Sequence, residues 1–132
     1  MSKDSVAKRI HDVSEQLDRI YRLKLMWFGS DVLVFPKAYL NWIRNFILDH
    51  MLKKDCELDM CYTSTGQICF AFRNQDKTKF CLDFLNGGSF HTHEGQWCWY
   101  DSNGNQKGEA HAGDLSNEMD VERLLNSFYV SK

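Results

Sequence analysis

From Leu58 onward, apolar and polar residues alternate, and short groups of turn-forming residues interrupt the alternation at regular intervals. A period of two places neighbouring side chains on opposite sides of a β-strand, so the pattern predicts strands with one apolar face. The turn-forming groups are Ser64-Thr65-Gly66, Gln75-Asp76-Lys77, Asn86-Gly87-Gly88, Glu94-Gly95 and Asn103-Gly104. Because five short turns join six strands in an up-and-down order, we expect a six-stranded antiparallel meander.

The turns also predict which residues pair across the strands, because a short loop sets the register of the hairpin that it closes. Counting from the first two loops places Met60 opposite Phe70, and Phe70 opposite Leu82. Counting from later loops places Phe84 opposite Phe90, Phe90 opposite Trp99, and Trp99 opposite Gly108. The expected apolar face consists of Leu58, Met60, Tyr62, Ile68, Phe70, Phe72, Phe80, Leu82, Phe84, Phe90, Trp97 and Trp99. Its aromatic rings either fill the core or line a cavity for an apolar small molecule.

Helices are expected on both sides of the strand region. A first helix is predicted from apolar residues spaced by three and four, namely Val6, Ile10, Val13, Leu17 and Ile20. This stripe either packs on the rest of the domain or forms a short dimerising coiled coil, so we expect a monomer or a homodimer. A second, more apolar helix is expected to begin at Pro36, because a proline in the first turn leaves no helical hydrogen bond unmade.

Residues 121–128 have the spacing of a short C-terminal helix. The predicted fold class is therefore α+β, with two N-terminal helices, a six-stranded antiparallel meander sheet curled around the second helix, and the short final helix. We expect a single α+β domain over residues 1–132, since a chain of this length fits one hydrophobic core.

Charge and apolar content narrow the class of partner. The formal net charge is −2, with 10 Lys or Arg against 6 Asp or Glu in residues 1–54 and 6 against 12 in residues 55–132. No dense basic run is available to neutralise phosphates, so we expect no nucleic-acid partner. No apolar run approaches the roughly 20 residues that span a bilayer, and the N-terminus lacks a secretory apolar core. We therefore expect a cytoplasmic protein with no membrane partner.

The polar face of the predicted sheet gathers sulfur and imidazole groups. The chain has five cysteines without a Cys-x-x-Cys pair, which argues against a disulfide framework and a zinc ribbon. The predicted register nevertheless places Cys98 directly across from His91, with His93 on the same side of the strand. A zinc site built from His91, His93 and Cys98, with Asp83 or His111 as a further ligand, is one interpretation. The other is an ordinary solvated sheet face on which cysteine is a small filler, and no cofactor.

The same face has a catalytic interpretation with less support. Asp83 beside His91 would form a base and its orienting group, and His91 next to Cys98 would lower the pKa of that thiol. However, no nucleophile stands in a recognisable elbow, and the glycine pairs lie in predicted hairpins, so no phosphate-binding loop is expected. We assign no catalytic residue.

Two regions are candidates for partner binding. Trp27 and Phe28 fall off the stripe of the first helix beside a turn, where exposed aromatic residues favour a protein contact. Glu94, Asp101 and Glu109 belong to acidic loops expected between residues 94 and 114. The leading hypothesis is a small non-enzymatic module that binds a protein partner. The alternative is a metal- or small-ligand-binding protein, with or without catalysis, that uses the His/Cys face.

In general character, although in no single motif, this small acidic α+β chain without a catalytic signature is similar to orphan cytosolic proteins of bacterial mobile elements. Gene-cassette products and immunity or anti-defence proteins are examples of that class.

Overall fold

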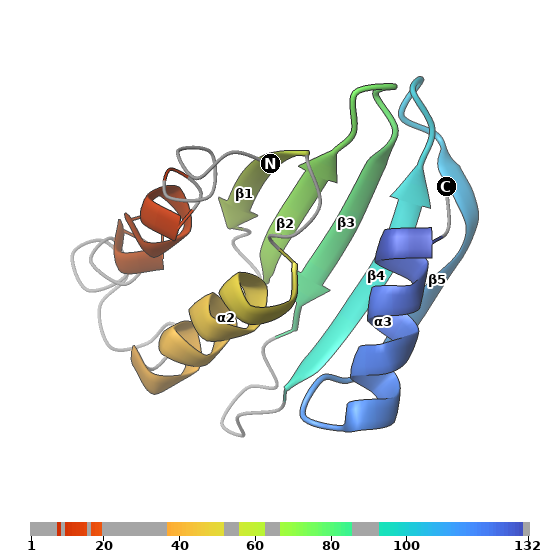
Figure 1. The fold of residues 1–132 in the computed structure, drawn as a ribbon. Helices are drawn as coiled ribbons and strands as arrows, with labels where there is room; N and C mark the ends of the chain where they lie inside the picture. The colour runs from red at the N-terminus through yellow and green to blue at the C-terminus, as the bar shows by residue number, and fades with distance from the viewer. Residues whose placement is uncertain are drawn as a thin grey trace. The chain divides into compact units, whose positions relative to one another are not determined.

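The structure is a computed structural model, and it describes residues 8, 10–15, 17–19, 37–51, 56–62, 67–85 and 93–130. The chain forms two compact units, Met1–Lys54 and Asp55–Lys132, and each is described by itself. The described residues form an α+β protein with three helices and a five-stranded antiparallel sheet (Figure 1). This confirms the predicted fold class. A single domain and a sheet curled around the second helix stay predictions.

The first unit contains two helices at the predicted positions. The described residues between 8 and 19 are helical, and Val13 and Leu17 of the predicted stripe are each 2% exposed. Ile10, which was expected on the same stripe, is 41% exposed. Of the three stripe residues that the structure describes, two are therefore buried as the spacing predicted and Ile10 is not.

Helix α2 (Lys37–His50) is the apolar second helix. Its buried side chains are Tyr39, Leu40, Ile43, Phe46 and Ile47. Tyr39, Trp42 and Phe46 stack along the helix, with ring centroids 5.9 Å and then 5.6 Å apart. Residues three and four apart lie on one helical face, which explains the stacking. None of the described helices has both the length and the apolar character needed to cross a bilayer.

The second unit contains the sheet, whose strands follow one another in chain order. The strands are β1 (Glu57–Tyr62), β2 (Ile68–Arg73), β3 (Lys79–Phe84), β4 (Glu94–Tyr100) and β5 (Gln106–Asp114). The registers predicted for the first two hairpins are confirmed, with Met60 opposite Phe70 and Phe70 opposite Leu82. Two backbone hydrogen bonds close the β2–β3 loop. The Asn74 N–H donates to the Thr78 carbonyl at 2.9 Å, and the Lys77 N–H donates to the Asn74 carbonyl at 3.0 Å.

The prediction of six strands is wrong in the described part of the chain. Strand β3 pairs directly with β4, so that Phe84 lies opposite Gly95 and Phe80 opposite Trp99. The Glu94-Gly95 pair, interpreted as a turn, is the beginning of β4. Phe90, expected to occupy a strand between them, lies outside the described residues. Gly95 was mistaken for a turn signal, but glycine is needed here to leave room for a side chain distant in the sequence. A Cβ on Gly95 would be 2.6 Å from Leu115 Cδ1.

The hairpin at Asn103-Gly104 is confirmed, but its register differs by one residue from the two-residue turn that was assumed. Gly104 has a φ of +85°, and the Asp101 carboxylate accepts hydrogen bonds from the backbone N–H groups of Asn103 and Asn105, each at 2.9 Å. This side chain stabilises a five-residue loop over 101–105, as aspartate does in Asx turns. Trp99 consequently lies opposite Lys107, where Gly108 was predicted.

Strand β5 then contains a β-bulge. Trp97 pairs with His111 whereas Trp99 pairs with Lys107, so three residues of β5 face Cys98. Gly108, at the start of this segment, has a φ of +74°, a conformation that glycine adopts without strain. The bulge and the longer loop together shift β5 away from the predicted alignment.

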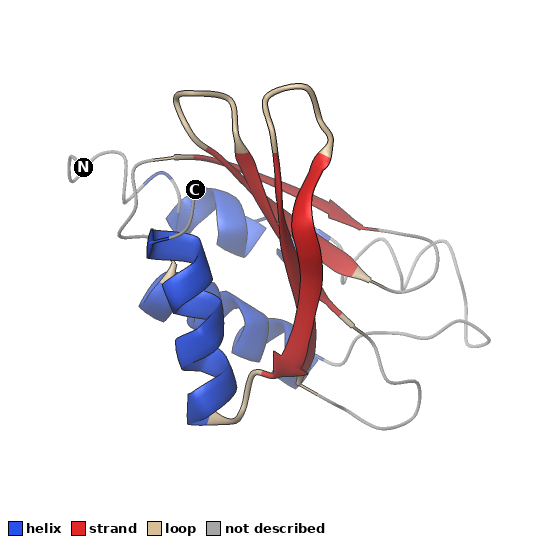
Figure 2. Ribbon diagram, turned by 90° about the vertical axis from the view of Figure 1, so that its right-hand side faces the viewer, coloured by secondary structure: helices blue, strands red, loops and turns tan. Residues whose placement is uncertain are grey.

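Helix α3 (Glu118–Val130) packs along one face of the sheet, over β4 and β5 (Figures 1 and 2). It begins after Asn117, whose side-chain oxygen accepts a hydrogen bond from the Met119 N–H at 2.9 Å and caps the helix. Its buried Phe128 ring lies 4.8 Å from the ring of Phe72. The Trp99 indole N–H donates to the Ser127 carbonyl at 3.0 Å. Helix α3 therefore covers part of the apolar sheet face, including Phe72, Phe80 and Trp99.

Candidate functional site

The four cysteines of strands β1 to β4 occupy positions on the side of the sheet opposite α3. We call this side the cysteine face; its described positions are Cys69, Ala71, Cys81, Asp83, Gln96, Cys98 and Tyr100. The strict alternation along β2, β3 and β4 separates these positions from the fully buried residues under α3. The prediction that cysteine side chains share one sheet surface is therefore confirmed for Cys69, Cys81 and Cys98.

The register brings these cysteines together in a way that the sequence did not predict. Cys98 lies directly opposite Cys81, and Cys69 lies directly opposite Asp83. Cys69 and Cys81 are diagonal neighbours, and their thiol groups are joined by a hydrogen bond. Three thiols from three adjacent strands thus form one contiguous group, which we call the thiol cluster. All three side chains are half-buried.

The hydrogen bond inside the thiol cluster makes its members chemically different. It raises the pKa of Cys69, and burial and the Asp83 carboxylate act in the same direction. The same hydrogen bond lowers the pKa of Cys81, assisted by the positive charge of Lys79 and opposed by burial. Burial raises the pKa of Cys98. Cys81 is therefore the thiol in this cluster that ionises first, with Cys69 retaining its proton as the donor.

Tyr100 extends the cluster along β4. Its hydroxyl forms a hydrogen bond with Cys98, two residues earlier on the same face, and this contact acts to lower the pKa of Cys98 against the larger effect of burial. The same contact, with burial, raises the pKa of Tyr100 to about 12. The Lys79 ammonium lies 5.7 Å from the centroid of the Tyr100 ring. A phenol donor thus stands beside the second thiol of the Cys81–Cys98 pair.

Charged residues lie towards the margins of the cysteine face. At one end, the Arg73 guanidinium lies 3.7 Å from the Glu57 carboxylate and 3.6 Å from that of Asp59. These side chains are exposed, and the long separations indicate weak, salt-screened attraction. At the other end, Glu94 and Asp114 are register partners. The positions between them carry thiol, methyl, amide and phenol groups and the Asp83 carboxylate.

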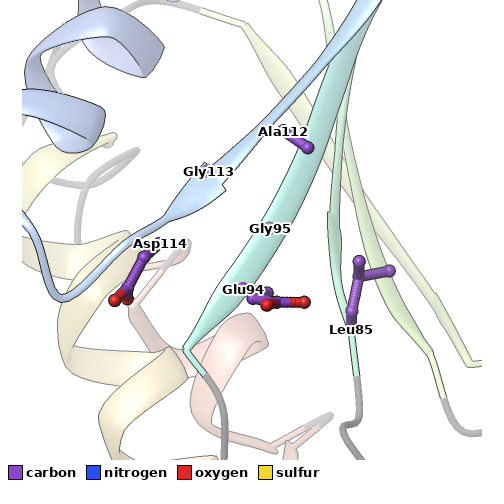
Figure 3. A pocket seen from close by; sticks show the side chains of 6 residues that line it. All are labelled: Leu85, Glu94, Gly95, Ala112, Gly113 and Asp114. Atoms are coloured by element: carbon purple, nitrogen blue, oxygen red, sulfur yellow. The ribbon is translucent and has the colours of Figure 1, made fainter.

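A shallow pocket of about 280 Å³ lies at the Glu94 end of the sheet (Figure 3). Its lining residues are Leu85, Glu94, Gly95, Ala112, Gly113 and Asp114. Figure 3 shows the Glu94 carboxylate extending towards Leu85 and the Asp114 carboxylate pointing away from it. Asp114 Oδ1 already accepts hydrogen bonds from the Ser116 N–H at 2.9 Å and from the Ser116 hydroxyl at 2.6 Å. The two carboxylates do not converge, so they do not form an acid–base pair.

The residues of the predicted zinc site are not assembled as expected. The predicted pairing of Cys98 with His91 is wrong, because Cys98 faces Cys81. His93 precedes Cys98 by five strand positions, which corresponds to about 17 Å, and His111 lies opposite Trp97 on the other side of the sheet. His91 itself lies outside the described residues, so its part in a zinc site stays a prediction. Within the described ranges, no group of three or more His, Cys, Asp or Glu side chains is arranged to hold a metal ion.

The predicted partner-binding residues have separate locations. Trp27 and Phe28 lie outside the described residues. Glu94 is exposed at the start of β4, and Glu109 is exposed in the bulge of β5. Asp101 is half-buried and holds the β4–β5 loop through its two hydrogen bonds. Its role in the structure is therefore to shape the β4–β5 loop.

Sequence reasoning missed the Cys81–Cys98 pair and the contact of Cys98 with Tyr100. The spacing of Cys98 and Tyr100 already places both on one side of a strand, which was a usable signal. The pairing with Cys81 had no such local signal, because it depends on β3 and β4 being neighbours. Comparison of the chain with protein-family models, curated proteins and solved structures found no match.

Proposed function

We propose that the protein is a non-enzymatic binding module that recognises a protein partner through the cysteine face. The observation that carries this proposal is the distribution of charge over that face: the row of Ala71, Cys81 and Cys98 is uncharged, and charged side chains, including Asp83 in the next row, lie around it. The cores of protein interfaces are depleted of charged residues and enriched in aromatic ones, whereas their rims are polar. The cytosolic location and the bacterial mobile-element origin expected from the sequence belong to the same hypothesis.

The centre of the face supports this proposal in detail. Four side chains of the face are half-buried by their neighbours in the sheet, namely Ala71, Cys81, Cys98 and Tyr100. They therefore form a nearly flat surface of methyl, thiol and phenol groups. Strand backbones hold them in place, and Tyr100 loses little freedom on binding because its hydroxyl is already hydrogen-bonded to Cys98. A rigid surface of this kind binds at a small entropic cost.

The margins would supply orientation and selectivity. Arg73 and Lys79, with Glu57 and Asp59 beside Arg73, lie at one end, whereas Glu94 and Asp114 lie at the other, so the two ends of the face differ in charge. Charges at the rim of an interface mainly affect the association rate and the choice of partner. The exposed Glu94 would therefore act at the rim, which keeps the predicted role of the acidic segment between residues 94 and 114.

The test introduces a charge into the centre of the face. The Ala71→Arg variant should lose a partner that the unmodified protein captures from its native host, because the long side chain would project from the face and prevent close packing of the partner against it. The Asn103→Arg variant is the matched control, since it adds the same charge in the exposed loop between β4 and β5. Binding of the purified partner should weaken at least about tenfold for Ala71→Arg, equivalent to about 1.4 kcal/mol.

Two results would refute the proposal. One is equal binding by both variants, with circular dichroism showing that both are folded. The other is that no protein is captured from the native host by the unmodified chain.

A further inference from the structure

The thiol cluster contains two kinds of neighbouring pair, and only one of them fits a disulfide. Directly opposed residues of an antiparallel sheet have Cα atoms about 4.5 or 5.5 Å apart. Both values lie within the range of roughly 4.4–6.8 Å found in disulfides. Cys81 and Cys98 are directly opposed, and their strands are adjacent in the sheet. This pair can close without a rearrangement of the backbone.

The other pair is suited to a hydrogen bond. Diagonal neighbours in a sheet lie about 7–8 Å apart, and their Cβ atoms, although somewhat closer, remain beyond the roughly 3.5–4.5 Å that a disulfide requires. Cys69 and Cys81 are such diagonal neighbours, and their thiols reach each other only as donor and acceptor. Cys69 is therefore a positioning residue for Cys81, while Cys98 is its candidate covalent partner.

We propose that Cys81 is a reactive nucleophile that exchanges with a low-molecular-weight disulfide such as glutathione disulfide, and that Cys98 resolves the product as a Cys81–Cys98 disulfide. The thiols belong to the face proposed to bind a protein partner, but the reaction does not rest on that function, because it needs only the half-exposed thiols of β3 and β4 in the free protein. Thiol–disulfide exchange proceeds by attack of a thiolate on a disulfide sulfur.

The reaction has two steps. In the first, the Cys81 thiolate attacks one sulfur of glutathione disulfide, an S–S bond forms between Cys81 and that glutathione, and the S–S bond of the reagent breaks to release one glutathione thiolate. In the second, the Cys98 thiol loses its proton to the solvent and attacks Cys81 Sγ, and the mixed disulfide breaks to release the second glutathione thiolate. Both released thiolates take up protons. Two protein thiols are oxidised by two electrons, and one glutathione disulfide is reduced to two glutathione molecules.

The charges in the cluster impose this order. The Cys69 hydrogen bond and the Lys79 ammonium lower the pKa of Cys81, whereas burial and the Asp83 carboxylate oppose this, and the net effect favours its ionised form. Charge on Cys81 raises the pKa of Cys98, so Cys98 is held back while Cys81 is ionised. Capping Cys81 in the mixed disulfide removes that charge. The Tyr100 hydroxyl, already hydrogen-bonded to Cys98, then stabilises the second thiolate.

The experiment treats the full-length protein with glutathione disulfide at neutral pH and maps the products by mass spectrometry. Chymotrypsin is the appropriate protease, because aromatic residues separate Cys81 from Cys98, whereas no Lys or Arg lies between them. The unmodified protein should yield a Cys81–Cys98 disulfide. The Cys98→Ser variant should accumulate a mixed disulfide of glutathione with Cys81. Cys56→Ala, which removes a buried thiol outside the cluster, should behave like the unmodified protein.

A second measurement tests the positioning role of Cys69. The alkylation rate of Cys81 by iodoacetamide at neutral pH should fall about tenfold in Cys69→Ala, the order expected for loss of one hydrogen bond to a charged group. Its pH profile should move to higher pH. Cys69→Ser should restore most of the rate, because a hydroxyl can still donate to the thiolate.

Several results would overturn the proposal. A Cys61–Cys69 disulfide as the main product would show that the other directly opposed pair reacts first. Failure of Cys98→Ser to form a mixed disulfide at Cys81 would show that Cys81 is not the nucleophile. An unchanged alkylation rate of Cys81 in Cys69→Ala would show that Cys69 does not activate Cys81.

Discussion

The contact between Gly95 and Leu115 leads to a quantitative prediction about the start of β4. Gly95 is buried, and an added Cβ would lie 2.6 Å from Leu115 Cδ1 and 3.2 Å from Leu115 Cγ. The Leu115 side chain is only 3% exposed, so it cannot swing into solvent to make room. Substitution of Gly95 by alanine should therefore force the core apart at this point.

Two opposing effects determine the size of the loss. Overpacking a core typically costs about 1–3 kcal/mol. Replacing glycine by alanine also restricts the unfolded chain and returns about 0.4–1 kcal/mol. The Gly95→Ala variant should thus lose between about 0 and 2.6 kcal/mol of unfolding free energy. This range is wide because the contact and the backbone effect are superimposed.

A double-mutant cycle with Leu115→Ala separates the two effects. Leu115→Ala alone should cost about 2–5 kcal/mol, as expected for a buried leucine. In the double variant the overpacking disappears, whereas the backbone effect of alanine at position 95 is present with either residue at position 115. The combined loss should therefore be smaller than the sum of the single losses by about 1–3 kcal/mol.

Urea unfolding, followed by circular dichroism and tryptophan fluorescence, measures these free energies, provided that the two transitions coincide. A coupling of about 2 kcal/mol corresponds to a shift of roughly 1 M in midpoint for a typical slope of about 2 kcal/mol per M. Gly104→Ala is the control, because no atom lies within 4 Å of its added Cβ. Its effect should add to that of Leu115→Ala. If Gly95→Ala is equally additive, within about 0.5 kcal/mol, Leu115 does not restrain Gly95 and the explanation of the strand start is wrong.

Three further predictions concern α3 and the segment that precedes it. Phe128→Ala should cost about 3–5 kcal/mol in urea unfolding, because it empties a fully buried ring site; a loss below 1 kcal/mol, on the order of a surface change, would contradict the docking of α3. Asn117→Ala should cost about 1 kcal/mol through loss of the helix cap, and an unchanged thermal midpoint would show that the cap is not used. Hydrogen bonds from the Ser116 hydroxyl and N–H hold the pKa of Asp114 below its usual value. The ionised carboxylate therefore stabilises the fold above its unfolded pKa near 4, and this contribution is lost as pH falls through the lower folded pKa. Asp114→Asn should be less stable than the unmodified protein at pH 6, with the difference shrinking on acidification; a constant difference across that range would exclude this linkage.

Much of the fold was accessible from the sequence. The registers of the first two hairpins were predicted correctly, with Met60 opposite Phe70 and Phe70 opposite Leu82. The strong alternation and the short loops leave only one alignment in which both apolar faces agree. The helices were accessible for the same kind of reason, since their apolar spacing has a period that strands cannot satisfy.

The candidate site was accessible only in part. Alternation placed Cys69, Cys81 and Cys98 on a common face, and the structure confirms this. Their mutual contacts were not predicted, because the misread turn at Glu94-Gly95 changed every partner of β4 in the strand before it. The group expected to activate Cys98 was His91, whereas its neighbours in the structure are Cys81 and Tyr100.

The sequence by itself determined which side of each strand a residue occupies, because that depends on a backbone period of two residues. Only the tertiary structure decided which strands are neighbours and where β4 begins. These choices depend on packing between residues distant in the chain, such as Gly95 against Leu115, and on the Asp101 side chain that lengthens the last hairpin loop. A glycine that makes room for a distant leucine and a glycine that forms a turn look alike in sequence, because only the folded chain shows what approaches the missing side chain.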